Sequence, residues 1–261
     1  MTRSLPALCA MISTLFLQPP ALAAAASDDG NSAALRITPQ FTYWRPQLFG
    51  TMRITKGSID FSGTDIDVHD DAELGPASAW QLGLDFAWQR HRVRVHYEPM
   101  RYRGSAIVDE PFVYHGITYQ PGERVFSHVD VNFYELSYDY LLSSSEHLDL
   151  RAGGGLYYWQ FFSHVEGSID GGSRTVTQVV PTMAAAAEGR WDAFKLGASA
   201  MLGTLGPDRQ MIDLTGYAGL LLGERVELDL GYRWMMFDFK EGTNDADFVA
   251  RGPYLSLAIA L

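Results

Sequence analysis

Alternation of apolar and polar residues is the main pattern along this chain. From residue 35 onwards, short segments place a large apolar side chain at every second position, with polar or small residues between. Residues 80–88, for example, read WQLGLDFAW. A period of two residues is typical of a β-strand with one apolar and one polar face.

Segments of this kind recur to the end of the chain, and they predict about ten strands, with eight as the alternative count. The segments are 35–43, 80–88, 93–99, 134–142, 148–158, 179–187, 194–202, 214–222, 226–234 and 255–261. After residue 30 there is no run of about 18 consecutive apolar residues, which disfavours membrane-spanning helices.

The connections between these segments alternate in length. The tight ones are 89–92, 143–146, 190–192 and 223–225, and the longer ones are 46–76, 104–125, 167–174, 206–210 and 240–247. A soluble β-sandwich also alternates, but here the polar faces carry bulky charges and the apolar faces carry large aromatic residues. We therefore predict an all-β fold, a single closed antiparallel transmembrane β-barrel, with periplasmic termini, short periplasmic turns and long extracellular loops.

The first residues, MTRSLPALCAMISTLFLQPPALAAAA, have the layout of a secretory signal. Arg3 supplies a positive charge, an apolar stretch follows, and small residues provide the cleavage pattern. The predicted organisation is a cleaved signal peptide at 1–26, a short periplasmic segment at 27–32 and the barrel domain at 33–261. Cys9, the one cysteine of the sequence, lies in the signal, so the mature chain must be stable without disulfides.

Acidic residues outnumber basic ones. The formal net charge of −11 becomes −11 − 1 = −12 when Arg3 leaves with the signal. Such a charge disfavours nucleic acid as an electrostatic partner.

The six tryptophans sort toward the two ends of the predicted strands. Trp44, Trp80, Trp159 and Trp234 fall near the outer ends, whereas Trp88 and Trp191 fall near the inner ends. Amphipathic rings favour the headgroup level of a bilayer, so these residues are predicted to form two interface girdles.

With its signal, alternating strands, turn–loop asymmetry and final segment GPYLSLAIAL, the chain resembles the small Gram-negative outer-membrane β-barrel proteins, the broad OmpA- and OmpW-like class. The final segment resembles the C-terminal signal read by the barrel-assembly machinery, although Leu261 stands where such strands usually end in Phe. The resemblance implies an integral protein of the cell outer membrane, with outer-membrane lipid and lipopolysaccharide as partners. It says almost nothing about activity.

If the apolar faces meet lipid, the polar faces line the lumen, and they carry many charges. The predicted lumen ion-pair network comprises Arg36, Asp85, Arg94, His96, Glu98, Glu135, Asp139, Asp149, Arg151, Glu188, Arg190, Lys195, Asp213, Glu227, Asp229 and Arg233. A ten-stranded lumen is narrow, and opposite charges inside it should pair and plug it. The excess of carboxylates keeps a narrow cation-preferring diffusion pore as the alternative.

Residues 63–75, GTDIDVHDDAELG, are strongly acidic and fall in the first long connection. We expect a solvated extracellular loop with no bound cofactor. Asp65, Asp67, Asp70, Asp71 and Glu73 are weak candidates for a divalent cation, since calcium takes six to eight oxygen ligands. One histidine and no thiolate argue against zinc.

No convincing catalytic constellation is present, so we expect a structural or interaction role rather than an enzyme. Ser127 and His128 are adjacent on one strand and therefore point to opposite faces. His164 lies near Glu166, and His96 lies two residues from Glu98, but neither spacing requires acid–base chemistry. An outer-membrane enzyme acting on lipid A or phospholipid is the second alternative.

Overall fold

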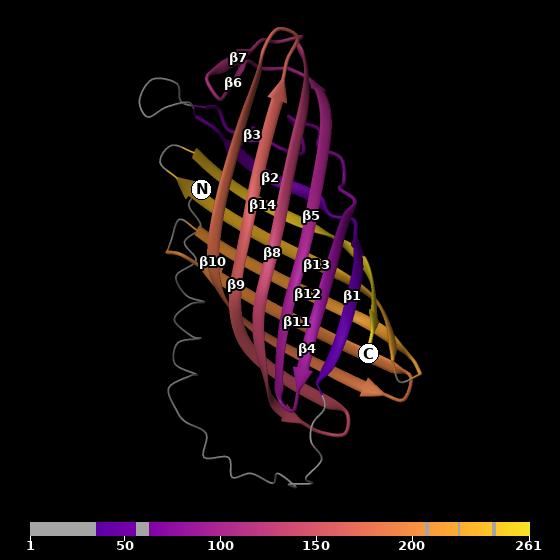
Figure 1. Cartoon of the computed structure of the whole chain (residues 1–261). Helices are drawn as coiled ribbons and strands as arrows, with labels where there is room; N and C mark the ends of the chain where they lie inside the picture. The colour runs from indigo at the N-terminus through magenta and orange to yellow at the C-terminus, as the bar shows by residue number, and fades with distance from the viewer. Residues whose placement is uncertain (1–34, 56–62, 207–208, 224, 242–243) are drawn as a thin grey trace. The chain divides into compact units, whose positions relative to one another are not determined.

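The structure, a computed structural model, describes residues 35–55, 63–206, 209–223, 225–241 and 244–261, so the predicted signal peptide lies outside the described residues. Within them, ten strands form an antiparallel barrel, and the last strand closes on the first (Figure 1). The wall strands, in order, are β1 (Arg36–Trp44), β4 (Ala79–Trp88), β5 (His91–Ile107), β8 (Arg124–Ser144), β9 (Leu148–Glu166), β10 (Gly171–Trp191), β11 (Phe194–Thr204), β12 (Arg209–Leu222), β13 (Val226–Glu241) and β14 (Asn244–Ile259). The predicted all-β, closed antiparallel barrel of about ten strands is confirmed. Among the described residues, no helix is long and apolar enough to cross a membrane.

Two of four further short strands, β2 (Gln47–Arg53) and β3 (Ile66–Asp67), extend this wall. β2 follows β1 after a break at Pro46, and both pair with β14. Proline has no backbone N–H to donate, which explains the interruption of the ladder there. β3 pairs with β2, whereas β6 (Phe112–Tyr114) and β7 (Ile117–Tyr119) form a separate hairpin.

The two ends of the barrel differ in their connections. At one end, residues 89–90, 145–147, 192–193 and 223–225 join neighbouring strands, so the predicted tight turns are confirmed. At the other end, residues 45–78 and 108–123 are long, as predicted. The predicted length of the remaining three is wrong, because only 167–170, 205–208 and 242–243 lie between the strands they join. These strands continue into the segments that we took for loops.

The long strands divide the barrel into two zones along its axis. β8 and β10 have 21 residues each, whereas about 9–11 tilted residues cross a bilayer. On the outer surface of β8, Leu136 and Tyr134 are exposed near the tight turns, and Asn132, Asp130 and His128 follow toward the opposite end. We call the zone of exposed large apolar residues the apolar belt, and the zone beyond it the crown.

Inward positions change in the opposite sense. On β8, Glu135, Ser137 and Asp139 face the lumen within the belt, whereas Val129 and Phe133 face inward in the crown. Aromatic rings from several strands meet there, including Phe161 stacked on Phe248 with centroids 5.4 Å apart. The crown is therefore a barrel with an apolar core, and the belt is a barrel with a polar lumen.

Both long connections fold into the mouth of the crown. At the inward-facing Gly104, a Cβ would lie 2.1 Å from the carbonyl oxygen of Ala72, so the first connection occupies that space. Tyr114 and Tyr119 of the β6–β7 hairpin are buried; the Tyr114 hydroxyl donates to Ser163 Oγ at 2.7 Å and that of Tyr119 to the Val165 carbonyl at 2.8 Å. Figure 1 shows this hairpin at the end of the barrel opposite the tight turns. The mouth is thus capped by the chain itself.

Candidate functional site

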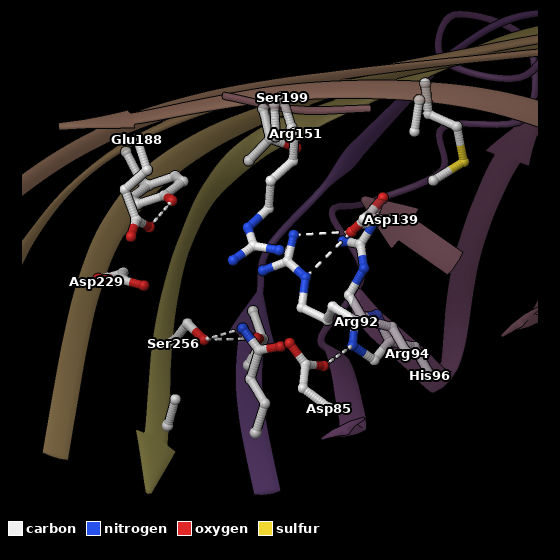
Figure 2. Close-up of a pocket in the computed structure, with 18 of the residues that line it drawn as sticks. Asp85, Arg92, Arg94, His96, Asp139, Arg151, Glu188, Ser199, Asp229 and Ser256 are labelled. Carbon is white, nitrogen blue, oxygen red and sulfur yellow. Dashed lines mark hydrogen bonds and ion pairs between the residues drawn. The ribbon is translucent and has the colours of Figure 1, made fainter. Parts of the chain in front are cut away.

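The polar lumen of the belt encloses a cavity of about 310 Å³. Every residue of the predicted lumen ion-pair network lines this cavity, and Figure 2 shows several of them pointing into it. They converge because residues two apart on a strand share a face, and ten strands bring their polar faces to one axis. The network is arranged in three tiers along the barrel.

The tier nearest the tight turns centres on Lys195. Its Nζ atom lies 2.5 Å from Glu227 Oε2 and 3.0 Å from Asp229 Oδ2. Arg190 pairs with Glu188 at 2.6 Å, and the Tyr217 hydroxyl donates a hydrogen bond to the same carboxylate. Burying these charges is tolerated because each has an oppositely charged partner.

The middle tier lies on β4, β5 and β8. Arg92 donates from Nε and Nη2 to Asp139 Oδ2, at 3.1 and 2.8 Å, and Arg94 Nη2 lies 3.2 Å from the same oxygen. His96 lies between two carboxylates, with Nδ1 3.2 Å from Glu135 and Nε2 3.4 Å from Asp85. This geometry holds the imidazole by both nitrogens and leaves neither free to exchange protons with a substrate.

The third tier centres on Arg233 and closes the polar zone. Its Nη1 donates to Glu98 Oε2 at 2.6 Å, and Nε and Nη2 donate to Asp213. The guanidinium also lies over the ring of Trp44, 4.7 Å from the ring centroid. Above Arg233 the lumen is apolar, so this residue marks the boundary between network and core.

Water reaches the network from the tight-turn end. The side chains of Arg36 and Arg190 are 45% and 44% exposed, whereas those of Arg233 and Glu98 are 9% and 3% exposed. Exposure therefore falls from the tight turns toward the crown. The cavity opens toward one end of the barrel and is closed at the other.

The predicted ion-pair network omits Arg92, Tyr157 and Tyr217, which line the cavity and bond to its carboxylates. Arg92 was assigned to a turn, but β5 begins at His91, and extending the alternation back from Arg94 would have placed it inward. Tyr157 donates to Glu135 Oε2 at 3.1 Å and is buried. Tyr157 and Tyr217 occupy polar positions of their alternating segments. They were left out of the predicted network because that network was restricted to charged residues and His96.

The predicted tryptophan girdles need correction. Trp44 and Trp159 are only 1% and 2% exposed; they face inward, where Trp44 contacts Arg233 and Trp159 contacts Phe239. Trp80, Trp88 and Trp191 are exposed on the outer surface, and Trp234 is half-buried. Tyrosines complete the edge of the belt next to the crown, with ring centroids 4.8 Å apart for Tyr97 and Tyr134, and 5.6 Å for Tyr134 and Tyr158.

The acidic stretch forms a compact turn rather than a cage of converging oxygens. Asp67 Oδ1 accepts the backbone N–H groups of His69 and Asp70, and Asp71 Oδ2 accepts that of Asp67. Asp65 pairs with Arg53. Within the described ranges, no group of three or more His, Cys, Asp or Glu side chains, those of Asp70 and Glu73 among them, is placed to hold a metal ion.

Two of the three histidines considered for catalysis, His128 and His164, lie on the outer wall of the crown, whereas His96 lies in the lumen. Ser127 is buried and faces inward, whereas His128 faces outward, where its Nε2 lies 2.8 Å from Asp130. His164 lies directly opposite His128 on the next strand, with Nε2 3.9 Å from Glu166. Neither histidine lines the lumen cavity.

Comparison with known proteins identifies the fold of this chain but no family. No protein-family model matches the sequence, and no curated protein matches it. Among solved structures, the chain is similar to the outer membrane protease OmpT of Escherichia coli, with a TM-score of 0.59, 8% identity, and coverage of 87% of this chain and 97% of that one. It also matches the transport unit of the autotransporter AIDA-I of Escherichia coli, with a TM-score of 0.42, 8% identity, and coverage of 96% and 94%.

The closed antiparallel barrel, the apolar belt and the likeness to OmpT define the class: this chain has the fold of the outer-membrane β-barrel proteins. At 8% identity the likeness concerns the fold alone, and barrels of this kind carry out different tasks.

Proposed function

We propose that this protein is a non-conducting integral barrel of the outer membrane, which acts through the exposed outer wall of its crown. The observation that carries the proposal is the apolar core that closes the lumen in the crown. The ion-pair network occupies the polar zone, and above it Met100, Phe133, Trp159 and Phe237 are buried between the walls. An ion crossing the barrel would have to pass an apolar core and leave its hydration water behind.

A planar bilayer experiment tests this proposal. Protein refolded into the bilayer should give flat current traces. The triple variant Trp159→Ala, Phe237→Ala, Phe248→Ala removes rings from the crown core and should leak small ions. The matched variant Trp80→Ala, Tyr134→Ala, Tyr158→Ala removes the same number of rings from the outer surface and should stay silent. Reproducible unitary steps in the unaltered protein would establish the narrow cation-preferring pore instead.

The outer wall of the crown offers a surface for the polar part of the outer leaflet. Arg103, His128 and His164 form one row across β5, β8 and β9, with Arg101 on the next outward row and Arg124 two outward rows away on the other side. This basic patch, in which Asp130 lies 3.0 Å from Arg103, is on the crown side of the Tyr97–Tyr134–Tyr158 edge of the belt. In a chain of strongly negative charge, a basic patch next to the headgroup level suits the phosphates of lipopolysaccharide.

Lipid carried through purification in mild detergent tests this partner. The variant Arg101→Gln, Arg103→Gln, Arg124→Gln should retain several-fold less phosphorylated lipid A per barrel, measured by mass spectrometry. Arg53→Gln is the control, because Arg53 is an exposed arginine paired with Asp65 in another part of the crown. Equal retention by the triple variant and the control would remove lipopolysaccharide from the proposal and leave the sealed barrel.

A further inference from the structure

One cation of the lumen lacks the partner that all the others have. Every other lumen cation lies within 4.0 Å of a carboxylate oxygen, namely Arg36, Arg92, Arg94, His96, Arg190, Lys195 and Arg233. Within the described part of the chain, no carboxylate oxygen lies that close to Arg151. Its Nη1 atom is buried and has no hydrogen-bond partner.

Arg92 adds a second positive charge beside Arg151, and the carboxylates that act on Arg151 electrostatically, Asp139, Asp149 and Glu188, do so without an ion-pair contact. Figure 2 shows Arg92 and Arg151 pointing into the same part of the cavity, and the two guanidinium groups are close enough to interact electrostatically. Arg92 uses Nε and Nη2 on Asp139, and Asp139 is shared with Arg94. Asp149, on the same strand as Arg151, accepts a 2.6 Å hydrogen bond from Ser144. A cation inside the barrel without a contacting counter-ion is unfavourable. The part of the cavity around Arg151 and Arg92 is therefore suited to bind an anion.

Small side chains on the strands beside Arg151 leave room for an anion. In the strand register Arg151 pairs with Ala186, Ala186 with Ser199, and Ser199 with Thr215. All four line the cavity of about 310 Å³. This volume is at the lower end of the range for small-molecule sites, about 300–1,000 Å³. The hydroxyl groups of Ser199 and Thr215 can donate hydrogen bonds from β11 and β12, on the same row of the wall as Arg151.

We propose that Arg151, flanked by Arg92 on one side and by Ser199 and Thr215 on the other, forms a binding site for a small oxyanion, a phosphate or a carboxylate, which enters from the tight-turn end. Guanidinium groups bind both anions through paired N–H donors. Entry from that end follows from the exposed Arg36 and Arg190 at the opening, whereas the capped crown blocks the other end. The site goes beyond the proposed function and does not depend on it, because a barrel that conducts nothing can hold a ligand.

Calorimetric titration of the detergent-solubilised protein tests the site, with inorganic phosphate in one arm and acetate in the other. We expect at least one anion to bind at one site per barrel with Kd below about 1 mM. Arg151→Gln should weaken binding about 10- to 100-fold, the range for a hydrogen bond to a charged group. The arm with the tighter binding identifies the anion class.

Three controls separate a built site from general lumen charge. Arg36→Gln removes a paired cation at the opening and should change affinity much less than Arg151→Gln. Ala186→Leu fills the cavity without changing charge and should abolish binding, whereas Ala187→Leu, which faces lipid on the same strand, should not. Without anion, Arg151→Gln should unfold no earlier on heating than the unaltered protein. Absence of saturation in both arms, equal weakening by Arg36→Gln, or destabilisation by Arg151→Gln without anion would overturn the site.

Discussion

Arg233 shows how one residue determines whether a charged lumen is stable. Its guanidinium donates to Glu98 and Asp213 and lies over Trp44, so three wall segments depend on one side chain. The Arg233 side chain is 9% exposed, and little water is available to replace these contacts. Removal of Arg233 would therefore leave the carboxylates of Glu98 and Asp213 without their counter-ion in a poorly solvated place.

Replacement of Arg233 by Gln should destabilise the barrel by about 3–5 kcal/mol, the cost of breaking a buried ion pair. Urea unfolding in lipid vesicles measures this free energy. Arg36→Gln is the matched control, with a 45% exposed side chain 3.5 Å from Glu227, and it should cost less than about 1 kcal/mol. Adding Glu98→Gln to Arg233→Gln should recover part of the loss. Similar losses for Arg233→Gln and Arg36→Gln would mean that water screens the third tier as well as the opening.

At the scale of single strands, alternation predicts which residues share a face but not which face meets lipid. Within the belt the polar face is inward, as predicted, and this is why Asp85, Arg94, Glu135 and the rest of the network line one cavity. Periodicity of two is a property of the extended backbone itself, so it survives any tertiary arrangement. The strands and the tight turns were therefore predictable from residue order alone.

In the crown the same strands reverse their polarity, and there the sequence reading failed. Val129, Val131 and Phe133 face inward while His128, Asp130 and Asn132 face out, without any break in the alternation of β8. The alternation along a strand does not indicate at which residue the outer surface passes from lipid to water. Trp44 and Trp159 were placed in the girdles for this reason, since an aromatic residue near the boundary suits either side.

Pairing across the lumen lay outside what the sequence could supply. The membership of the network follows from alternation, but the partners come from strands far apart in the chain, as in the bond between Glu98 and Arg233. Which cation lacks a partner depends on the tilt and register of ten strands together. The unpaired position of Arg151 is consequently a property of the closed barrel, and no local pattern around residue 151 indicates it.

At the scale of the whole molecule, the two zones imply two solvents outside one continuous wall. Along β8 the outward side chains pass from Leu142 through Leu136 and Tyr134 to Asn132 and Asp130. Their neighbours on the strand show the reverse inside, with Asp139 and Glu135 giving way to Phe133 and Val129. A barrel in water throughout would have no reason to expose leucines at one end and fill its lumen with charges there.

Placing one charge at two levels of the same strand tests this division. Leu136→Arg puts a cation on the outer surface of the apolar belt, one outward position inside its edge, and should cost about 1–4 kcal/mol, since the cost rises toward the bilayer midplane. Asn132→Arg, also outward and four residues nearer the crown, should cost about 0–1 kcal/mol, because it lies at or beyond the interface. Both free energies follow from urea unfolding in vesicles of defined thickness. The two positions share the strand, the face and the introduced arginine. Strand propensity and general charge effects of the arginine therefore cancel in the difference. Equal costs would mean that lipid does not distinguish Leu136 from Asn132, and the belt would then have to be buried against protein instead.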